Sequence, residues 1–343
     1  YENNSRTIIC NFLFQMKIAI IKKDYNPCGG GAERYTAVVA RGLSARGHNV
    51  IVFAENISNE KDDNIEFIKV PRANFGGFSR TANFNYSVNK ILKKTNTHYD
   101  ISYALSRVIP TDIFRVSEQI HAVWLKHGYP KWQIMNPRHI ELLNLEKKVF
   151  QQKNTKAVVV NSDLSKKIIL ENYDYPENKI FHIPNGVDRN KFFPAKSESE
   201  ICEIRKKLNI HENKTILLFP GTNYKIKGIS AILKTLLKLD SNNRNKIFVI
   251  AVGSTPGEKV LKEIKQKNLH NCFRFDGHSE NMRDYYIASD LLFFPTIYEP
   301  FANVCLEACA CALPVLTTAL NGSSELISNR ENGFVIESYA DID

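Results

Sequence analysis

Two glutamates in the last quarter of the chain are the residues best placed to do chemistry. Glu299 and Glu307 stand eight positions apart, and a helix is expected to begin between them. A carboxylate accepts two hydrogen bonds from a vicinal diol, so Glu307 could bind a ribose and Glu299 the hydroxyls of another sugar. The backbone N–H groups of residues 301–304 would face an anion at the start of that helix. By spacing alone, two ordinary surface glutamates would be the better interpretation.

Two glycine-containing loops supply groups that suit a phosphate. In residues 27–34, Gly30 and Gly31 lie between a strand and a helix, where the backbone can approach an anion at the helix N-terminus. Residues 221–228 contain Thr222 and Lys227, and the lysine ammonium could offer a point charge to a diphosphate. A tight turn and a solvated loop lysine are the alternatives.

The elements that must position these residues alternate between strand and helix. Apolar runs predict strands at 17–22, 50–53, 157–160, 179–183, 215–219, 247–252, 272–275, 291–294, 314–317 and 334–336. Helical periodicity predicts helices at 32–46, 139–153, 162–172, 228–239, 256–267, 280–288 and 302–311, with Ser162 as a cap. Such alternation indicates parallel sheets. The predicted fold class is therefore α/β, with two doubly wound Rossmann-like domains facing across a cleft and ligands at the carboxyl ends of the strands.

The break Pro184-Asn185-Gly186 predicts the domain boundary. We expect an N-terminal domain at 16–187, which binds the acceptor, and a C-terminal domain at 188–343, which binds the nucleotide sugar. Met16 opens a clean strand, so residues 1–15 are interpreted as an extension outside the fold. The chain stops soon after the strand at 334–336, so the second domain is expected to be cut short.

Composition limits the partners. The net charge of +10 suits an anionic partner, or simply a basic enzyme. No run of about 18 apolar residues predicts a membrane span, and no nucleic-acid recognition motif accompanies the charge. The seven cysteines have no paired metal spacing, and we interpret Cys305, Cys309 and Cys311 as packed core residues. Free thiols favour a cytoplasmic location.

Several of these segments together resemble the family 4 retaining glycosyltransferases, whose E-x7-E segment matches Glu299 and Glu307. The similarity covers about residues 16–336. It includes the stretches at 311–318 and 321–327 that follow the two glutamates, and the glycine loop and helix at 29–48. It also includes interdomain segments at 161–162 and 183–188, a base-binding loop at 275–278 and a late turn at 332–334.

The resemblance implies a GT-B fold that binds a nucleotide sugar as co-substrate, with no cofactor. It places Lys227 on the diphosphate and Glu307 on the ribose, while backbone near His278 reads the base. No divalent metal is expected, because helix dipoles and Lys227 would stabilise the leaving diphosphate. The expected donor-binding residues are Gly30, Gly31, Thr222, Lys227, His278, Glu299, Pro300, Phe301, Ala302, Asn303, Val304 and Glu307.

His121 completes the expected catalytic set of His121, Lys227 and Glu299. Relatives often place a histidine at this point beside the reacting sugar, and Glu118 is a possible neighbour. Retention would follow from attack on the front face, with a donor phosphate oxygen taking the proton, so His121 would orient the sugar. The alternative is a packed histidine at a strand end.

Residues 121–150 are the expected acceptor and membrane segment. Aromatic and basic residues together suit an anionic membrane interface, although an amphipathic helix packed on the domain fits equally well. The residues concerned are Trp124, Lys126, Tyr129, Lys131, Trp132, Arg138, Lys147 and Lys148. The segment resembles lipopolysaccharide core glucosyltransferases, which implies a glycan or lipid-linked acceptor at the inner membrane face and a UDP-sugar, such as UDP-glucose, as donor.

Three alternatives stay open. A mannosyltransferase using GDP-mannose would share these motifs. A non-catalytic nucleotide- or glycan-binding relative is suggested by Ala302 and Ala312, which replace common family glycines, and by the expected truncation. A nicotinamide oxidoreductase is suggested by the glycine loop and Glu55, but Arg34 stands where the third glycine of that fingerprint belongs.

Overall fold

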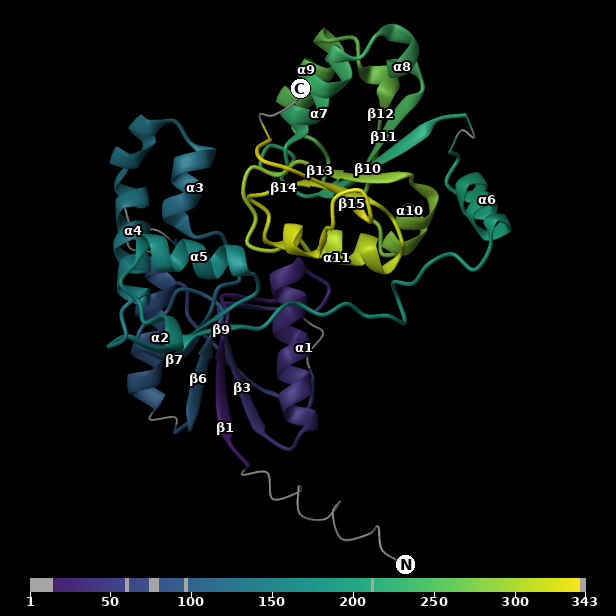
Figure 1. Cartoon of the computed structure of the whole chain (residues 1–343). Helices are drawn as coiled ribbons and strands as arrows, with labels where there is room; N and C mark the ends of the chain where they lie inside the picture. Colours follow the sequence, from purple (N-terminus) through teal and green to yellow (C-terminus); the bar gives the residue numbers. More distant parts are fainter. Residues whose placement is uncertain (1–14, 59–61, 74–79, 96–97, 211–212, 340–343) are drawn as a thin grey trace, which may run out of the picture. The chain divides into compact units, whose positions relative to one another are not determined.

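A computed structural model describes residues 15–58, 62–73, 80–95, 98–210 and 213–339. The chain forms two compact units (Figure 1). Unit 1 holds the described residues up to Val160 together with Lys166–Ile183, and unit 2 holds Asn161–Ser165 together with the chain from Pro184 onward. Unit 1 thus ends at Ile183, just before the predicted boundary at 187. The five residues Asn161–Ser165, which the prediction placed in the N-terminal domain, belong to unit 2. The predicted extension lies, apart from Gln15, outside the described residues.

Unit 1 is built on a parallel sheet in the order β5-β3-β1-β6-β7-β8-β9. Its strands are β1 (Lys17–Ile21), β3 (Asn49–Ala54), β5 (Glu66–Lys69), β6 (Ile101–Ala104), β7 (Thr111–Arg115), β8 (Thr155–Val160) and β9 (Ile180–His182). A second small sheet pairs β2 (Asp24–Tyr25) with β4 (Asn56–Ile57). Because β1 lies between β3 and β6, the chain reverses its direction across the sheet there, and ligands favour the carboxyl ends of strands at such a point.

The helices of this region are α1 (Gly31–Ala45), α2 (Arg80–Thr95), α3 (His121–Gly128), α4 (Pro137–Val149) and α5 (Asp163–Asn172). Figure 1 shows α1 on one side of the unit 1 sheet and α2 and α4 on the other. Polar side chains start two of the helices. Asn136 accepts the N–H of Arg138 at 3.0 Å before α4, and Ser162 accepts the N–H of Ser165 at 3.1 Å, which confirms the predicted cap.

Unit 2 repeats the arrangement with the strand order β12-β11-β10-β13-β14-β15. Its strands are β10 (Thr215–Gly221), β11 (Ile247–Gly253), β12 (Phe273–Gly277), β13 (Leu291–Phe294), β14 (Val315–Thr318) and β15 (Gly333–Ile336). Its helices are α6 (Glu198–Lys207), α7 (Ile229–Lys238), α8 (Ser241–Asn245), α9 (Glu258–Gln266), α10 (Met282–Ala288) and α11 (Asn303–Ala310). Along β10, Ile216 and Leu218 enter one core while Leu217 and Phe219 enter the other, so both faces of the sheet are buried.

The predicted alternation of strands and helices in parallel sheets is confirmed. The polar stretch 60–100, for which no element was predicted, holds β5 and α2, and β6, β7, α3 and α6 were missed as well. No helix in the described ranges is both long and apolar enough to cross a bilayer.

Candidate active site

Two residues from neighbouring loops of unit 2 form an ion pair, between Nζ of Lys227 and Oε2 of Glu299. Lys227 follows β10 and Glu299 follows β13, and these strands pair in parallel. The unit 2 sheet changes direction between these strands, since β11 and β12 lie on the other side of β10. The pair therefore lies where a doubly wound sheet is expected to bind its ligand, and it brings together two predicted site residues.

A glycine with no room for a side chain holds the Lys227 loop against the sheet. Gly228 has a left-handed φ of 90°, and a Cβ there would lie 1.9 Å from the carbonyl oxygen of Pro295. The carbonyl of Ile226 accepts the N–H of Ile297 at 2.9 Å and the hydroxyl of Thr296 at 3.0 Å. These contacts tie the loop to the segment that leads into Glu299.

The backbone around Glu299 is fixed from the other side by the turn after β14. Glu299 donates its N–H to the carbonyl of Leu320, and its own carbonyl accepts the N–H of Gly322, both at 2.9 Å. A Cβ on Gly322 would lie 1.9 Å from the Pro300 carbonyl oxygen and 2.4 Å from Ser162 Oγ. Glu299 is thus placed by backbone contacts that leave its carboxylate to Lys227.

The predicted anion site at the start of α11 is only partly as expected. Helix α11 begins at Asn303, and its N-cap residue Ala302 has no capping side chain. The Ala302 N–H is donated to Oδ1 of the buried Asn321 at 3.2 Å, so this amide does not face an anion. The side chains of Pro300, Phe301 and Ala302 are buried, which leaves only backbone from these residues for a ligand.

Glu307 lies inside α11 with 8% of its surface exposed. Its Oε2 accepts the hydroxyl of Tyr286 at 2.8 Å. Burial, and then the charge of Glu307, raise the pKa of Tyr286 well above its usual value, so the phenol stays a hydrogen-bond donor to the carboxylate. The sequence pointed to Glu307 but not to Tyr286 in α10, which lies in no recognisable motif. Asn321 lies in a segment that resembles the family, but no role was predicted for it.

Thr222 and His278 lie at the same edge of the sheet. Thr222 is exposed, and its carbonyl accepts the Ser254 hydroxyl at 2.5 Å. His278 is exposed and follows β12, which is separated from β10 by β11. His278 is therefore farther from Lys227 along the edge than Glu299 is.

The predicted phosphate loop of unit 1 begins helix α1. Gly30 is its N-cap, with an extended backbone and no capping side chain, and Gly31 is its first residue. The carboxylate of Glu33 lies 2.9 Å from the place where a Cβ on Gly30 would sit. An anion at this helix start would therefore meet a carboxylate as well as the helix N–H groups.

His121 is the first residue of α3, rather than a residue at a strand end, and is 8% exposed. Its N–H is donated to Glu146 Oε2 at 2.7 Å, and its Nε2 lies 3.1 Å from Nδ1 of His139. Burial lowers the pKa of His121 to about 4, because the attraction of Glu146 does not outweigh desolvation and the charge of Arg107. The imidazole is therefore neutral at physiological pH.

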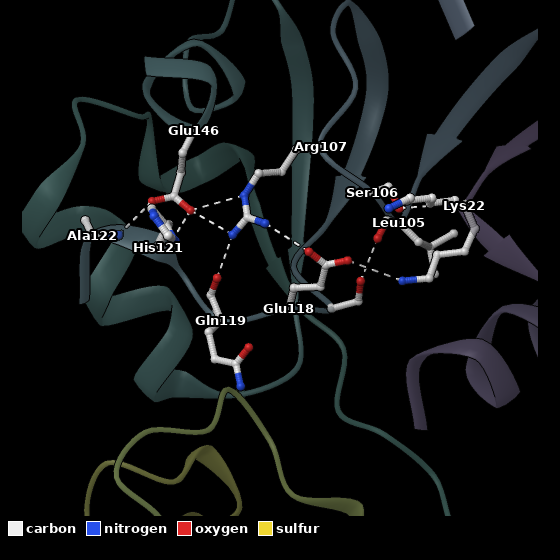
Figure 2. Close-up of polar contacts among 11 residues, drawn as sticks. Lys22, Leu105, Ser106, Arg107, Glu118, Gln119, His121, Ala122 and Glu146 are labelled. Atoms are coloured by element: carbon white, nitrogen blue, oxygen red, sulfur yellow. Dashed lines mark hydrogen bonds and ion pairs between the residues drawn. The ribbon is translucent and has the colours of Figure 1, made fainter. Parts of the chain in front are cut away.

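Figure 2 shows the charged network beside His121. Arg107 donates to Glu146 Oε2 at 2.9 Å and to Glu118 Oε2 at 2.9 Å, and Lys22 lies 3.5 Å from Glu118 Oε1. Lys22, Arg107 and Glu146 are buried, whereas the Glu118 side chain is 45% exposed. Of these four residues, only Glu118 was predicted from the sequence. Lys22, Arg107 and Glu146 come from separate elements without a shared motif.

The acceptor segment exposes part of its predicted aromatic surface. Trp132 is 69% exposed and Met135 80% exposed, on the turn before α4. Trp124 is half-buried, and its ring packs edge-on against Tyr129 with centroids 5.7 Å apart. Trp132 and Met135 are thus more exposed than Trp124.

Two family models match consecutive parts of the chain. The model described as Glycosyltransferase Family 4 matches residues 29–191, and Glycosyl transferases group 1 matches residues 200–343. Neither family model describes a nicotinamide-dependent oxidoreductase. The alternative suggested by the glycine loop and Glu55 therefore has no support from these matches.

Individual relatives are distant but extensive. The lipopolysaccharide glucosyltransferase WaaG of Escherichia coli K12 is 22% identical over 94% of this chain and 85% of its own. A galactosyltransferase of Escherichia coli, which uses UDP-Gal and a GlcNAc-diphosphoundecaprenol, is 27% identical over 73% of this chain and 65% of its own.

Solved structures show the same fold. The crystal structure of WaaG superposes with a TM-score of 0.82 at 23% identity, covering 93% of this chain and 85% of its own. Anabaena HepE, solved with UDP and glucose, gives 0.70 at 20% identity, covering 95% of this chain and 87% of its own. The chain is therefore a family 4 glycosyltransferase with a GT-B fold of two Rossmann-like domains, resembling the enzymes of lipopolysaccharide core synthesis.

Proposed function

We propose that this protein transfers a hexose from a UDP-sugar, such as UDP-glucose, to a glycan or lipid-linked acceptor with retention of configuration. The observation that carries the proposal is the Lys227–Glu299 ion pair at the point where the unit 2 sheet changes direction. The names of two relatives support the choice of donor, since one is a glucosyltransferase and the other uses UDP-Gal.

Each of three residues binds a different part of the donor. Lys227 binds the diphosphate, Glu307 the ribose hydroxyls and Glu299 the hydroxyls of the transferred sugar. When the donor binds, the Lys227 ammonium leaves Glu299 and pairs with the diphosphate. The Glu299 carboxylate is then free to bind the sugar. The leaving diphosphate is stabilised by Lys227 and the N-terminus of α11 without a divalent metal.

His121 orients the reacting sugar. The neutral imidazole can accept a hydrogen bond from a sugar hydroxyl or donate one to it, and it adds no charge. The acceptor oxygen attacks C1 from the face that UDP leaves, so the C1–O bond to UDP breaks as the new C1–O bond forms. The acceptor proton passes to an oxygen of the departing diphosphate, and His121 is not a general base.

A panel of donors tests this proposal. The chain is incubated with UDP-glucose, UDP-galactose or GDP-mannose and a lipopolysaccharide core acceptor, with and without EDTA, and nucleotide release and the anomeric configuration of the product are followed by NMR. The proposal predicts UDP release that EDTA does not affect and a retained anomer. Release of GDP alone would identify a mannosyltransferase, and no turnover with any donor would support a non-catalytic relative.

The exposed turn before α4 provides the proposed contact with the inner face of an anionic membrane. Trp132 and Met135 would insert between lipid head groups, while the exposed Lys131 and Arg138 would face lipid phosphates. Replacing both Trp132 and Met135 by Ser should reduce sedimentation with phosphatidylglycerol vesicles. Replacing the exposed Leu237 of unit 2 by Ser is the matched control. Unchanged binding by the first variant would exclude this turn.

A further inference from the structure

A buried carboxylate from another helix occupies the start of α3. Glu146, which is 1% exposed, accepts the N–H of His121 at 2.7 Å and the N–H of Ala122 at 3.1 Å (Figure 2). The N-cap position of α3 is held by Ile120, whose side chain cannot accept a hydrogen bond. Glu146 therefore does the capping that a local Ser or Asp usually does.

This carboxylate is itself fixed by buried donors. Arg107 approaches Oε2 through Nε at 3.2 Å and Nη2 at 2.9 Å, and the Tyr173 hydroxyl is donated to Oε1 at 2.5 Å. Burying such charges is costly, and a single polar N-cap residue would satisfy the same helix at lower cost. The network also joins α3 to the loop after β6, which a local cap would not do. The accurate placement of His121 explains the geometry of this network better than helix stability alone does.

The ring of His121 is held from the same helix. His139 Nδ1 lies 3.1 Å from His121 Nε2, and the two ring centroids are 5.1 Å apart. His139 and Glu146 are seven residues apart in α4, which is two helical turns, so they lie on one face. In a hydrogen bond between two imidazole nitrogens one must donate and the other accept, so the contact restricts both the rotation and the tautomer of His121.

We propose that one face of α4 positions His121: Glu146 holds its backbone, and His139 fixes the orientation and tautomer of its ring. Glu146 and His139 are positioning residues, which act on the sugar only through His121. The inference rests on the proposed role of His121 beside the reacting sugar. It adds two residues from α4 that touch neither the donor nor the acceptor.

The first test reads the His121 ring directly. The chain is labelled with 15N-histidine, and the signal of His121 is assigned by its loss in His121→Ala. Nitrogen shifts report which ring nitrogen carries the proton. We expect one tautomer in the wild-type chain and a mixture in His139→Phe, which keeps an aromatic ring against Tyr129 but has no ring nitrogen. A single unchanged tautomer in His139→Phe would overturn the role of His139, whether or not the protein turns over UDP-glucose.

The second test asks whether Glu146 acts through His121. Release of UDP from UDP-glucose, with water as acceptor, is measured for Glu146→Gln and His139→Phe in the wild-type and His121→Ala backgrounds. Each should lower kcat about tenfold in the wild-type background and less than twofold in His121→Ala, because coupled residues are not additive. An equal loss in both backgrounds would overturn the proposal.

Tyr175→Phe is the matched control for this cycle. It removes a buried hydrogen bond from unit 1, between the Tyr175 hydroxyl and the Thr155 carbonyl at 2.9 Å, without touching Glu146. It should lower the free energy of unfolding while leaving kcat unchanged. If wild-type protein released no UDP at all, the proposed donor would be wrong, and the nitrogen shifts of His121 in Glu146→Gln and His139→Phe would still decide the positioning question.

Discussion

Lys227 and Glu299, 72 residues apart in the chain, are ion-paired at the carboxyl edge of the unit 2 sheet. The residues predicted to bind the diphosphate and the sugar therefore bind each other before the donor arrives. This arrangement neutralises two half-buried charges. Under the proposed function, the Glu299 carboxylate becomes free only when the donor binds. The ion pair also means that the two side chains should have opposite effects on nucleotide affinity.

Removing the negative partner should release Lys227 for the diphosphate. We expect Glu299→Gln to raise the affinity for UDP a few-fold, because the lysine no longer has to leave a carboxylate. The same change should reduce turnover of UDP-glucose, since the sugar loses a charged acceptor. Calorimetric titration with UDP, together with turnover assays, measures both effects. A fall in UDP affinity would show that Glu299 does not compete with the nucleotide.

Removing the positive partner should have the reverse effect. Lys227→Ala should lower the affinity for UDP about 10- to 100-fold, the usual effect of losing a charged hydrogen bond. Lys225→Ala, which removes an exposed lysine from the same loop, is the control and should change the affinity less than about twofold. Equal losses in the two variants would mean that the loop attracts nucleotide by general charge.

Gly322 should not tolerate a side chain. A methyl group there would lie 1.9 Å from the Pro300 carbonyl oxygen, so the backbone that carries Glu299 would have to move. We expect Gly322→Ala to lower the free energy of unfolding by about 3 kcal/mol, as measured by urea denaturation. Gly186→Ala, at an exposed glycine with open space around it, should cost less than about 0.5 kcal/mol. Similar costs at the two positions would contradict the close approach seen at Gly322.

Ala312 adopts a left-handed φ of 61° after α11. Because a Cβ is strained in that conformation, Ala312→Gly should raise the free energy of unfolding by about 1 kcal/mol. The neighbouring Ala310→Gly, in the last residue of α11, should lower it by a similar amount. Thermal and urea unfolding distinguish the signs, and destabilisation by both substitutions would contradict strain at Ala312.

The depressed pKa of His121 predicts an acid-sensitive contribution to stability. Its folded-state pKa of about 4 lies below the usual 6.5, so the unfolded chain takes up a proton at a higher pH than the folded chain does. The contribution is complete above pH 6.5 and is lost as the pH falls from 6.5 to 4. By pH 5 the loss should amount to about 2 kcal/mol.

Urea denaturation of the wild-type chain and His121→Asn at pH 7.5 and pH 5 isolates this contribution. Other groups titrate in both proteins, so their effects cancel in the comparison. The wild-type chain should lose more stability than the variant between the two pH values. If both proteins lose the same amount of stability, the pKa of His121 in the folded state is close to its ordinary value, and the prediction is wrong.

The proposed donor-binding residues of unit 2 were more visible in the sequence than the residues around His121 in unit 1. Lys227, Glu299 and Glu307 lie in two continuous segments whose spacing and family likeness can be read directly. The ion pair that joins two of them depends on the pairing of β10 with β13, which no local pattern specifies. Tyr286 lies in a helix without a motif, and Asn321 had no predicted role although its segment resembles the family, so only the folded chain identifies their contacts.

The elements missed in unit 1 explain why its charged network was missed. Strand β7 begins Thr111-Asp112, and helix α2 carries many polar residues, so apolar periodicity is weak in both. The Asp112 carboxylate in fact binds Ser102 at the start of β6, with its Oδ2 accepting the Ser102 N–H at 2.8 Å. Arg107 and Glu146 become neighbours only when these strands and α4 are assembled.

Titration of the chain and of Glu307→Ala with UDP, GDP and ADP tests the central claim most directly, because Glu307 is fixed by Tyr286 and is assigned to the ribose. We predict saturable binding that is strongest for UDP and at least about tenfold weaker in the variant, the effect of losing a charged hydrogen-bond acceptor. Equal affinity of the two chains for UDP, or no binding of any nucleotide by the wild-type chain, would contradict the assignment of unit 2 as the donor site.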